Sequence, residues 1–226
     1  HGHRAPTRPQ RRPCERGAVG QVLALQTILS VDTGAAELLL AQMRARSHVA
    51  PKRLEAPGPN ADELNFIFNA AAQAPDHGRI QPWRFIVVPP NHREALGHAF
   101  VQALQARDAN ASPAELNAAY DKAFRAPCLV LAVVKLAPSE PQVPAHERLI
   151  SLGCAIQNML LMAQTLGIGS GITSGQAMNA PSIRELFQLP ADEQSVCYLA
   201  FGRVSAHKAK RARPNHTRFV SSLERI

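Results

Sequence analysis

One stretch of the chain says more about its fold than any other: Ala74-Pro75-Asp76-His77-Gly78-Arg79-Ile80-Gln81-Pro82-Trp83-Arg84-Phe85. It connects an expected helix to the apolar run Phe85-Ile86-Val87-Val88, which has the composition of a strand. Two prolines and a glycine restrict its backbone. It also holds the only Trp of the chain and several polar side chains that suit a flat, polar ligand. A connection this specific predicts a binding site on a rigid scaffold.

Helices are expected before this stretch. Residues 19–30 and 35–46 have helical patterns, and a proline-rich connector follows over 51–59. The sequence Asn60-Ala61-Asp62-Glu63 is a capping box, in which the Asn accepts a backbone N–H and the Glu reaches back. The apolar residues after it recur at the spacing of a helical core stripe: Leu64, Ile67, Phe68 and Ala71.

Helices and strands alternate after this stretch. Two further capping boxes, Asn91-His92-Arg93-Glu94 and Ser112-Pro113-Ala114-Glu115, begin helices, and a long apolar helix comes later. The expected helices are 91–106, 112–125, 146–166 and 181–187. The expected strands are 84–88, 128–134 and 196–201, of which the second is apolar throughout and suits a strand buried on both faces. This order predicts an α+β fold around one sheet.

Composition favours one core and argues against a nucleic-acid surface. The chain has 226 residues, 46% of them hydrophobic, which suffices for one sizeable domain. Its net charge is +8, but residues 1–16 carry +4 and residues 201–226 carry +6, which leaves −2 for the body. A nucleic-acid binder usually spreads cations over one face, with aromatic residues among them. Binding of nucleic acid through the basic ends is therefore a minor alternative.

The N-terminal residues and the cysteines carry little functional signal. Residues 1–17 are rich in Arg and Pro, so we expect 1–34 to be an extension that is disordered or tag-derived over at least 1–17. No apolar run approaches the roughly 20 residues of a membrane span, and a cytoplasmic location is the default expectation. The four cysteines, Cys14, Cys128, Cys154 and Cys197, have no metal-site spacing, so no metal is expected.

Three polar clusters stand apart from the core pattern. The first, Arg44-Ala45-Arg46-Ser47-His48, suits a phosphate, because guanidinium groups bind phosphate bidentately, although cations also favour a helix C-terminus for electrostatic reasons. The second is His77 in the opening stretch, and a lone His is more often structural than catalytic. The third, 167–175, is rich in glycine but does not match G-x-G-x-x-G, so a dinucleotide fold is not expected.

The C-terminal basic run has two interpretations. Arg203 and the cluster Lys208-Ala209-Lys210-Arg211-Ala212-Arg213 follow the last expected strand. They form either a solvated tail or a second cationic group for the phosphate of the first cluster.

Together these clusters resemble the flavin-dependent nitroreductase family, in particular its compact NAD(P)H nitroreductase branch. The resemblance covers about 35–223, and its most specific part is Ala-Pro-Asp-His followed by Gln-Pro-Trp in the opening stretch. The weaker segments, in order, are Arg46-Ser47, Phe124-Arg125-Ala126-Pro127, Gly153-Cys154-Ala155, Ser174-Gly175 and Phe219-Val220. The resemblance implies a nitroreductase-like α+β fold over 35–226, with a central, mostly antiparallel sheet flanked by helices in an intertwined homodimer.

The resemblance also implies a function. It predicts an FMN at each of two subunit-interface sites, and a ping-pong cycle in which NADH or NADPH delivers a hydride and a nitroaromatic, quinone or similar small molecule accepts it. The chemistry belongs to the flavin, so no catalytic side chain is expected. A flavin-binding or sensing protein with little turnover is the alternative, and neither nucleic acid nor a membrane is an expected partner.

Cofactor contacts are implied residue by residue. Ala45, Arg46 and Ser47, with Arg44 beside them, would hold the FMN phosphate and the polar ring edge. Gln73 and His77 would reach the flavin from the partner subunit. The residues that would line the ring are Ile172, Thr173, Ser174 and Gly175. Lys208 and Arg211, or Lys210, could reach the phosphate, and Arg46 is the candidate for stabilising negative charge on the reduced flavin.

The chain departs from the family pattern at three places. The usual paired arginines are Ala45-Arg46 here, with Arg44 displaced by one position. A frequent Trp-Arg pair is Ile172-Thr173, and Gln73 stands where Arg is common. Each change removes positive charge near the flavin, which predicts weaker FMN binding or a shifted flavin potential.

Overall fold

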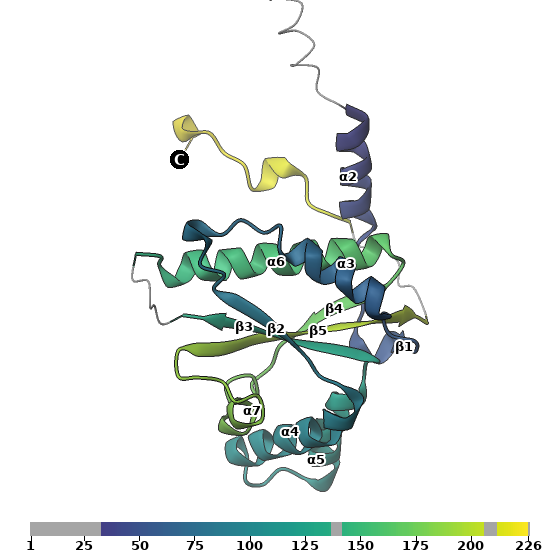
Figure 1. Cartoon of the computed structure of the whole chain (residues 1–226), viewed down its shortest axis with the longest axis vertical. Helices are drawn as coiled ribbons and strands as arrows, with labels where there is room; N and C mark the ends of the chain where they lie inside the picture. Colours follow the sequence, from purple (N-terminus) through teal and green to yellow (C-terminus); the bar gives the residue numbers. More distant parts are fainter. Residues whose placement is uncertain (1–32, 137–141, 206–211, 226) are drawn as a thin grey trace, which may run out of the picture. The chain divides into compact units, whose positions relative to one another are not determined.

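The computed structural model describes residues 33–136, 142–205 and 212–225. The chain divides into two units, 1–41 and 42–226, which are described separately. The described part of the first unit is helical and belongs to α2 (Thr33–Ala45) (Figure 1). The helix expected over 19–30 and the N-terminal segment 1–17 lie outside the described residues.

A five-stranded sheet is the centre of the second unit (Figure 1). The strands are β1 (Leu54–Glu55), β2 (Trp83–Val87), β3 (Cys128–Lys135), β4 (Gly169–Thr173) and β5 (Glu193–Val204). The order is β1-β5-β3-β2, with β4 also paired to β5, and all these pairings are antiparallel. This confirms the predicted α+β class with a mostly antiparallel sheet.

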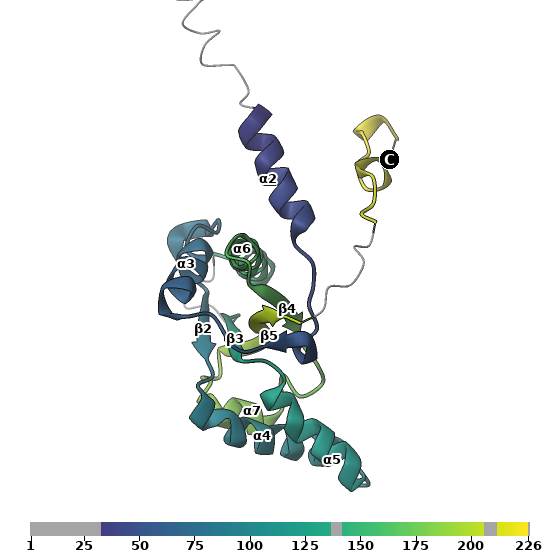
Figure 2. The ribbon, with the colours of Figure 1, turned by 90° about the vertical axis from the view of Figure 1, so that its right-hand side faces the viewer.

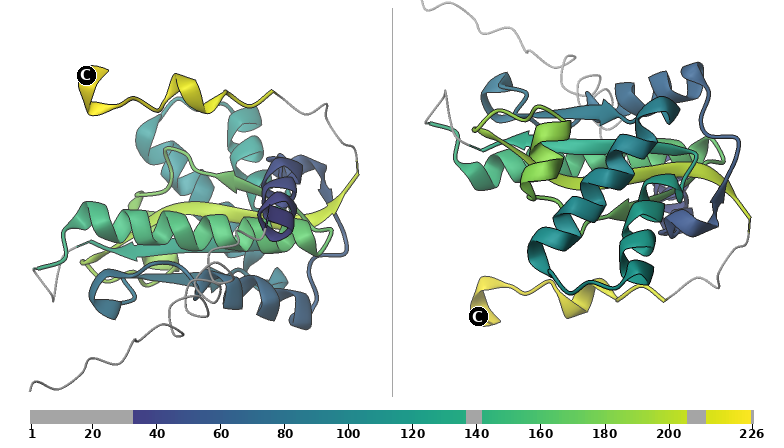
Figure 3. Two further views of the ribbon diagram at one scale, coloured as in Figure 1. Left: turned by 90° about the horizontal axis from the view of Figure 1, so that it is seen from above. Right: turned by 90° about the horizontal axis from the view of Figure 1, so that it is seen from below.

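Helices cover both faces of the sheet (Figure 2). Helices α3 (Ala61–Ala71) and α6 (Ala145–Thr165) lie on one face, and the opposite face carries α4 (Arg93–Arg107), α5 (Pro113–Tyr120) and α7 (Pro181–Leu186). The two views of Figure 3 show these layers from either side. The remaining described elements are 3-10 turns at Pro51–Arg53, His77–Arg79, Pro90–His92, Asp121–Phe124, His216–Arg218 and Leu223–Arg225.

Strand β3 separates two apolar cores. Val130 and Val134 pack with Ile67 of α3 and Met159 of α6, whereas Leu131 packs on the other side with residues of α4 and α7. Residues 128–134 are all buried, as their continuous apolar pattern predicts for a strand covered on both faces. The two faces of the sheet therefore form distinct environments for any site beside them.

Local signals predicted two of the three expected capping boxes correctly. Asn60 and Ser112 each accept the N–H of the Glu three residues on, and each Glu bonds back. The box at Asn91 is wrong, because a 3-10 turn beginning at Pro90 precedes α4 and the Asn91 side chain bonds the His92 ring instead, at 3.0 Å. The helix expected to reach Arg125 ends at Tyr120 and continues as a 3-10 turn.

The glycine-rich segment after α6 contains a strand that its composition concealed. No strand was expected there, but Gly169–Thr173 is β4, paired along β5. Gly171 permits a close approach on the other edge of β4: a Cβ there would lie 2.1 Å from the Val49 carbonyl oxygen. The Val49 N–H donates to the Ser170 carbonyl at 2.9 Å, and His48 forms a parallel bridge with Ser170. This contact attaches the first polar cluster to the sheet.

Candidate functional site

The opening stretch is fixed to the α3–α6 side of the sheet. Its 3-10 turn, His77–Arg79, contains Gly78 at φ +71°, a left-handed conformation that glycine adopts without strain. The Asp76 carboxylate accepts the N–H of Gln81 at 2.6 Å. The Trp83 indole N–H donates to the Ser151 hydroxyl of α6 at 2.9 Å. These bonds hold the turn against the helix independently of any ligand.

His77 and Gln73 lie at the surface of this side. The His77 Nδ1 atom is 2.5 Å from Glu147 Oε2 near the start of α6, and 63% of the His77 side chain is exposed. Gln73 is exposed and has a long contact, 3.5 Å, with the Asn69 carbonyl. Neither lines the pocket that contains Thr173, Ser174 and Gly175. Their contact with a flavin across a subunit interface therefore stays a prediction.

Arg46 and Arg213 form a cationic pair. The Arg213 Nη2 atom donates to the Arg46 carbonyl at 3.2 Å. Burial lowers the pKa of the half-buried Arg46, and the positive charge of Arg213 lowers it further. Within the described ranges neither guanidinium has an acidic partner. Two adjacent, unneutralised guanidinium groups are an arrangement that favours an oxyanion.

The structure describes only some of the other residues that were predicted to bind the phosphate. Arg44 and Ser47 are exposed and Ala45 is half-buried. Lys208, Lys210 and Arg211 lie outside the described residues. Arg213 belongs to the basic run that was expected to form either a solvated tail or a second cationic group for the phosphate, but it was not among the residues named as phosphate contacts.

The residues expected to line the flavin ring lie at the end of β4. Thr173 is opposite Tyr198 of β5, and Ile172 is opposite Leu199. Since neighbouring residues of a strand point to opposite faces, the Ile172 and Thr173 side chains face different layers. Thr173, Ser174 and Gly175 line one pocket, whereas Ile172 is 40% exposed and is not among its lining residues.

The bridge between His48 and Ser170 relates the two clusters. Because this bridge is parallel, the chain before His48 runs beside the start of β4, and the chain after it runs toward Thr173. The start of β4 and its end at Thr173 are four residues apart, about 13 Å of extended chain. The fold thus places the first polar cluster beside the first residues of β4, and the third cluster contains this strand and the loop that follows it.

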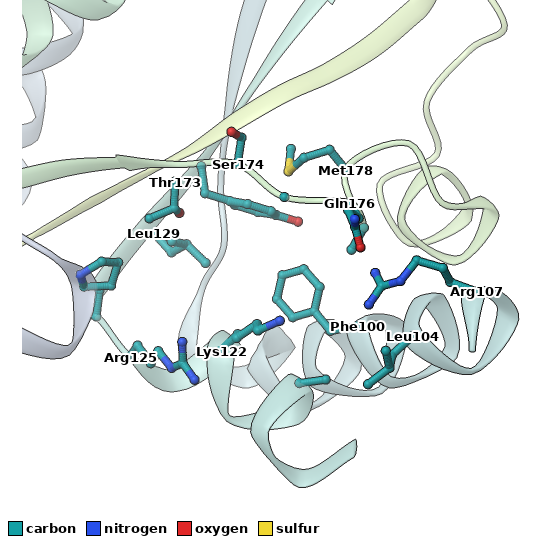
Figure 4. A pocket seen from close by; sticks show the side chains of 16 residues that line it. Phe100, Leu104, Arg107, Lys122, Arg125, Leu129, Thr173, Ser174, Gln176 and Met178 are labelled. Carbon is teal, nitrogen blue, oxygen red and sulfur yellow. The ribbon is translucent and has the colours of Figure 1, made fainter. Parts of the chain in front are cut away.

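A pocket of about 380 Å³ lies on the α4–α5–α7 side, beyond Thr173 (Figure 4). Three cationic side chains, Arg107, Lys122 and Arg125, line its helical side. Thr173, Ser174, Gly175, Gln176, Ala177, Met178, Leu129 and Tyr198 line it from the sheet and the following loop, and Pro51, Phe100, Leu104, Ala119 and Ala126 complete it. None of the three cations was named as a site residue from the sequence, although Arg125 lies in one of the segments that carry the family resemblance, because each is exposed on a helix or beside a turn, where cations are common.

Tyr198 gives this pocket a buried polar group. The residue is 4% exposed, and its hydroxyl has no hydrogen-bond partner within the described part of the chain. Burial raises the pKa of Tyr198, so the hydroxyl stays protonated at neutral pH and can donate. Buried hydroxyl groups are rarely left without a partner.

The described residues contain no cluster of His, Cys, Asp and Glu suited to a metal ion. None of the helices within those residues is both long and apolar enough to cross a bilayer. Cys128, Cys154 and Cys197 are free thiols.

Comparisons with known proteins agree with this architecture. The model of the Nitroreductase family matches residues 45–203. A Haemophilus influenzae protein with a provisional NAD(P)H nitroreductase name is 34% identical over 71% of this chain and 85% of its own. Escherichia coli YdjA, named in the same way, is 33% identical over 66% of this chain and 80% of its own.

Solved structures show the same fold at lower identity. A nitroreductase-like family protein of Bacillus cereus superposes with a TM-score of 0.69 at 20% identity, over 82% of this chain and 96% of the other. A Bacteroides fragilis nitroreductase with bound FMN gives a TM-score of 0.61 at 21% identity, over 82% and 98%.

Proposed function

This chain belongs to the nitroreductase family and is an NAD(P)H-dependent oxidoreductase, and we propose that it transfers a hydride from NADH or NADPH, by way of FMN, to a nitroaromatic, quinone or similar small acceptor. The observation that carries the proposal is the contact between Arg46 and Arg213, two cations with no acidic partner in the described ranges, close to the bridge by which His48 joins the strand that ends at Thr173. We further propose that NAD(P)H and the acceptor use the site in turn.

The residues present fit FMN. A phosphate needs cationic donors, and Arg46 and Arg213 supply two. A flat ring needs open space beside backbone, and a Cβ built on Gly175 meets nothing within 4 Å. The length of β4 between these features, on the order of 13 Å, suits an elongated ligand with a charged end and a planar end.

Each part of the chain would have its own task. Arg46 and Arg213 would bind the phosphate, with the Ser47 hydroxyl as a further donor. Bound FMN supplies the hydride chemistry. Thr173, Ser174 and Gly175 would place the ring at the mouth of the pocket, where an acceptor can approach it. The fixed opening stretch would keep His77 at the surface, and Gln73 lies directly before this stretch.

A homodimer is part of the proposal. Exposed apolar side chains occur along α2, and others occur on α6 near the opening stretch. They are Leu38, Leu39, Leu40 and Met43 on α2 and Leu149 and Ile150 on α6. Such surfaces mark protein–protein contacts. We propose that a second copy covers these apolar side chains and brings its own Gln73 and His77 to the flavin. Light scattering at micromolar concentration should then give twice the mass of one chain. A cytoplasmic location stays a prediction.

Steady-state kinetics test the activity. Under anaerobic conditions, NADH or NADPH oxidation should depend on added nitroaromatic or quinone, and varying both substrates should give the parallel reciprocal plots of a ping-pong reaction. A protein that retains FMN but oxidises neither nucleotide with any of these acceptors would be the flavin-binding or sensing protein instead.

A further inference from the structure

The pocket beside Ser174 has charges that the proposed FMN site does not use. Arg107 lies at the end of α4 and Lys122 lies in the 3-10 turn after α5. Arg125 is the residue that follows this turn. In Figure 4 they lie on the helical side of the pocket, across from Ser174, Gln176 and Met178. The pocket has no Asp or Glu in its lining. Its fixed charge is therefore entirely positive.

These three cations are not neutralised by the protein. None of them forms an ion pair within the described ranges, and Arg125 makes only a long contact, 3.4 Å, with the Ala118 carbonyl. Three cations elsewhere do form ion pairs: Arg84 with Glu193, Lys135 with Asp192 and Arg203 with Glu63. All three cations of the pocket are therefore available for an anion.

The interior of the pocket suits a ring. Phe100, Leu104, Leu129 and Met178 provide apolar walls. Phe100 packs edge-on against Tyr198, with ring centroids 5.8 Å apart, which fixes the direction of both rings. A volume of about 380 Å³ holds a one- or two-ring compound. The unpartnered Tyr198 hydroxyl, which is buried, adds one donor for a polar atom of that compound.

The pocket is separate from the phosphate cluster. Its cations come from α4 and the segment after α5, whereas Arg46 and Arg213 come from the two ends of the second unit. Arg46 precedes the bridge at Ser170, and the pocket begins at Thr173, beyond it. The two sets of cations therefore come from different elements, and we assign a separate anionic group to each.

We propose that this pocket binds the electron acceptor and selects an aromatic carboxylate, with its ring between the apolar walls, its carboxylate at Arg107, Lys122 and Arg125, and its reducible group at the Thr173–Gly175 edge. This assignment rests on the proposed function. For 4-nitrobenzoate, one turnover takes a hydride from NAD(P)H and a proton from solvent, breaks one N–O bond, and yields the nitroso compound, water and NAD(P)⁺.

Binding of an acid that cannot be reduced tests the pocket apart from turnover. Calorimetric titration of the purified protein with 2-naphthoate should give a Kd at least tenfold lower than titration with the neutral analogue 2-naphthylmethanol. Lys122→Gln and Arg107→Gln should each weaken naphthoate binding roughly threefold to tenfold, the range for one charged contact near the surface. Lys135→Gln, which removes an ion-paired cation on β3 outside this pocket, should leave it unchanged.

Tyr198→Phe provides a variant whose stability and binding should change independently. Because the hydroxyl has no partner among the described residues, its removal should leave the Tm of the ligand-free protein unchanged or raise it. Naphthoate binding should nevertheless weaken severalfold. An unchanged Kd would exclude the hydroxyl as a ligand contact.

Several outcomes would overturn the inference. Equal affinity for naphthoate and naphthylmethanol would do so, as would naphthoate binding that Lys122→Gln and Arg107→Gln leave intact. Displacement of naphthoate by added FMN would assign the pocket to the cofactor instead. Naphthoate binding without NAD(P)H-dependent reduction of 4-nitrobenzoate supports the pocket but contradicts the proposed function. Turnover with equal KM for 4-nitrobenzoate and neutral 4-nitrobenzyl alcohol supports the function and contradicts the pocket's selectivity.

Discussion

The two faces of the sheet differ in the charges that line their cavities. On the α3–α6 face, Ile67 and Met159 pack in a buried core, and a cavity of about 620 Å³ beside Trp83 is lined by the acidic Asp76 as well as by two arginines. The candidate ligand residues His77 and Gln73 lie at the surface of this side. On the α4–α5–α7 face, a pocket of about 380 Å³ interrupts the packing and contains a buried hydroxyl and three cations. The proposed acceptor pocket, whose fixed charge is entirely positive, is formed by one chain, whereas the proposed flavin contacts of His77 and Gln73 would come from a second chain.

Alkaline pH should destabilise the protein, because two thiols are buried in the α3–α6 core. Burial raises the pKa of Cys128 and of Cys197 to about 11, and both thiols pack in that core. The unfolded thiols ionise near pH 9, so the free energy of unfolding should fall between about pH 9 and 11, by roughly 2–3 kcal/mol for each thiol. Urea unfolding as a function of pH measures this loss.

Cys197→Ala is the matched variant for this prediction. This variant should show about half the decrease in the free energy of unfolding between pH 9 and 11, because it lacks one thiol that ionises only in the unfolded state. Burial also raises the pKa of Tyr198, on the pocket side, so Tyr198→Phe should reduce any further loss above pH 10. A free energy of unfolding that stays flat from pH 9 to 11 would show that the thiols are open to solvent.

Arg46→Gln tests the cationic pair that joins the two ends of the second unit. Loss of one charge-assisted hydrogen bond should weaken FMN binding by about 1.5–3 kcal/mol, or 10- to 100-fold. Arg213→Gln should have a similar effect, and the exposed Arg44→Gln a smaller one. Fluorescence titration of the flavin-free protein gives the three Kd values. An Arg44 effect larger than that of Arg46 would place the phosphate elsewhere.

Gly171→Ala tests the attachment of the first cluster to β4. The new Cβ would lie 2.1 Å from the Val49 carbonyl oxygen, so the segment at His48 must move away from the strand. The expected cost is about 1–3 kcal/mol of stability, together with weaker FMN binding. Gly175→Ala is the control for stability, because its Cβ meets nothing within 4 Å. Equal Tm values for the two variants would contradict the predicted close approach.

Trp83→Phe tests the anchor of the opening stretch. It removes the hydrogen bond to the Ser151 hydroxyl and should cost about 1 kcal/mol of stability. Ser151→Ala should cost a similar amount. If this bond carries the effect, the double variant should cost less than the sum of the two single variants. Strict additivity would show that the bond does not hold the stretch to α6.

Features governed by neighbours in the sequence could be predicted, and features assembled by the fold could not. The capping boxes at Asn60 and Ser112 are local, so their patterns gave the correct helix starts. Strand β4 was missed because its glycines conceal the strand pattern, although Gly171 is required there by contact with Val49. The three cations of the proposed acceptor pocket were missed for a similar reason. Arg107, Lys122 and Arg125 come together only after α4 packs against the turn that follows α5.

The proposed function is tested most directly by alternate anaerobic additions to the purified protein. NADH or NADPH should bleach the visible absorption of bound FMN, and subsequent addition of 4-nitrobenzoate or a quinone, without further nucleotide, should restore it in stoichiometric amount. A purified protein that neither retains nor takes up FMN, or a bleached flavin that none of these acceptors reoxidises, would contradict a flavin oxidoreductase that serves donor and acceptor in turn.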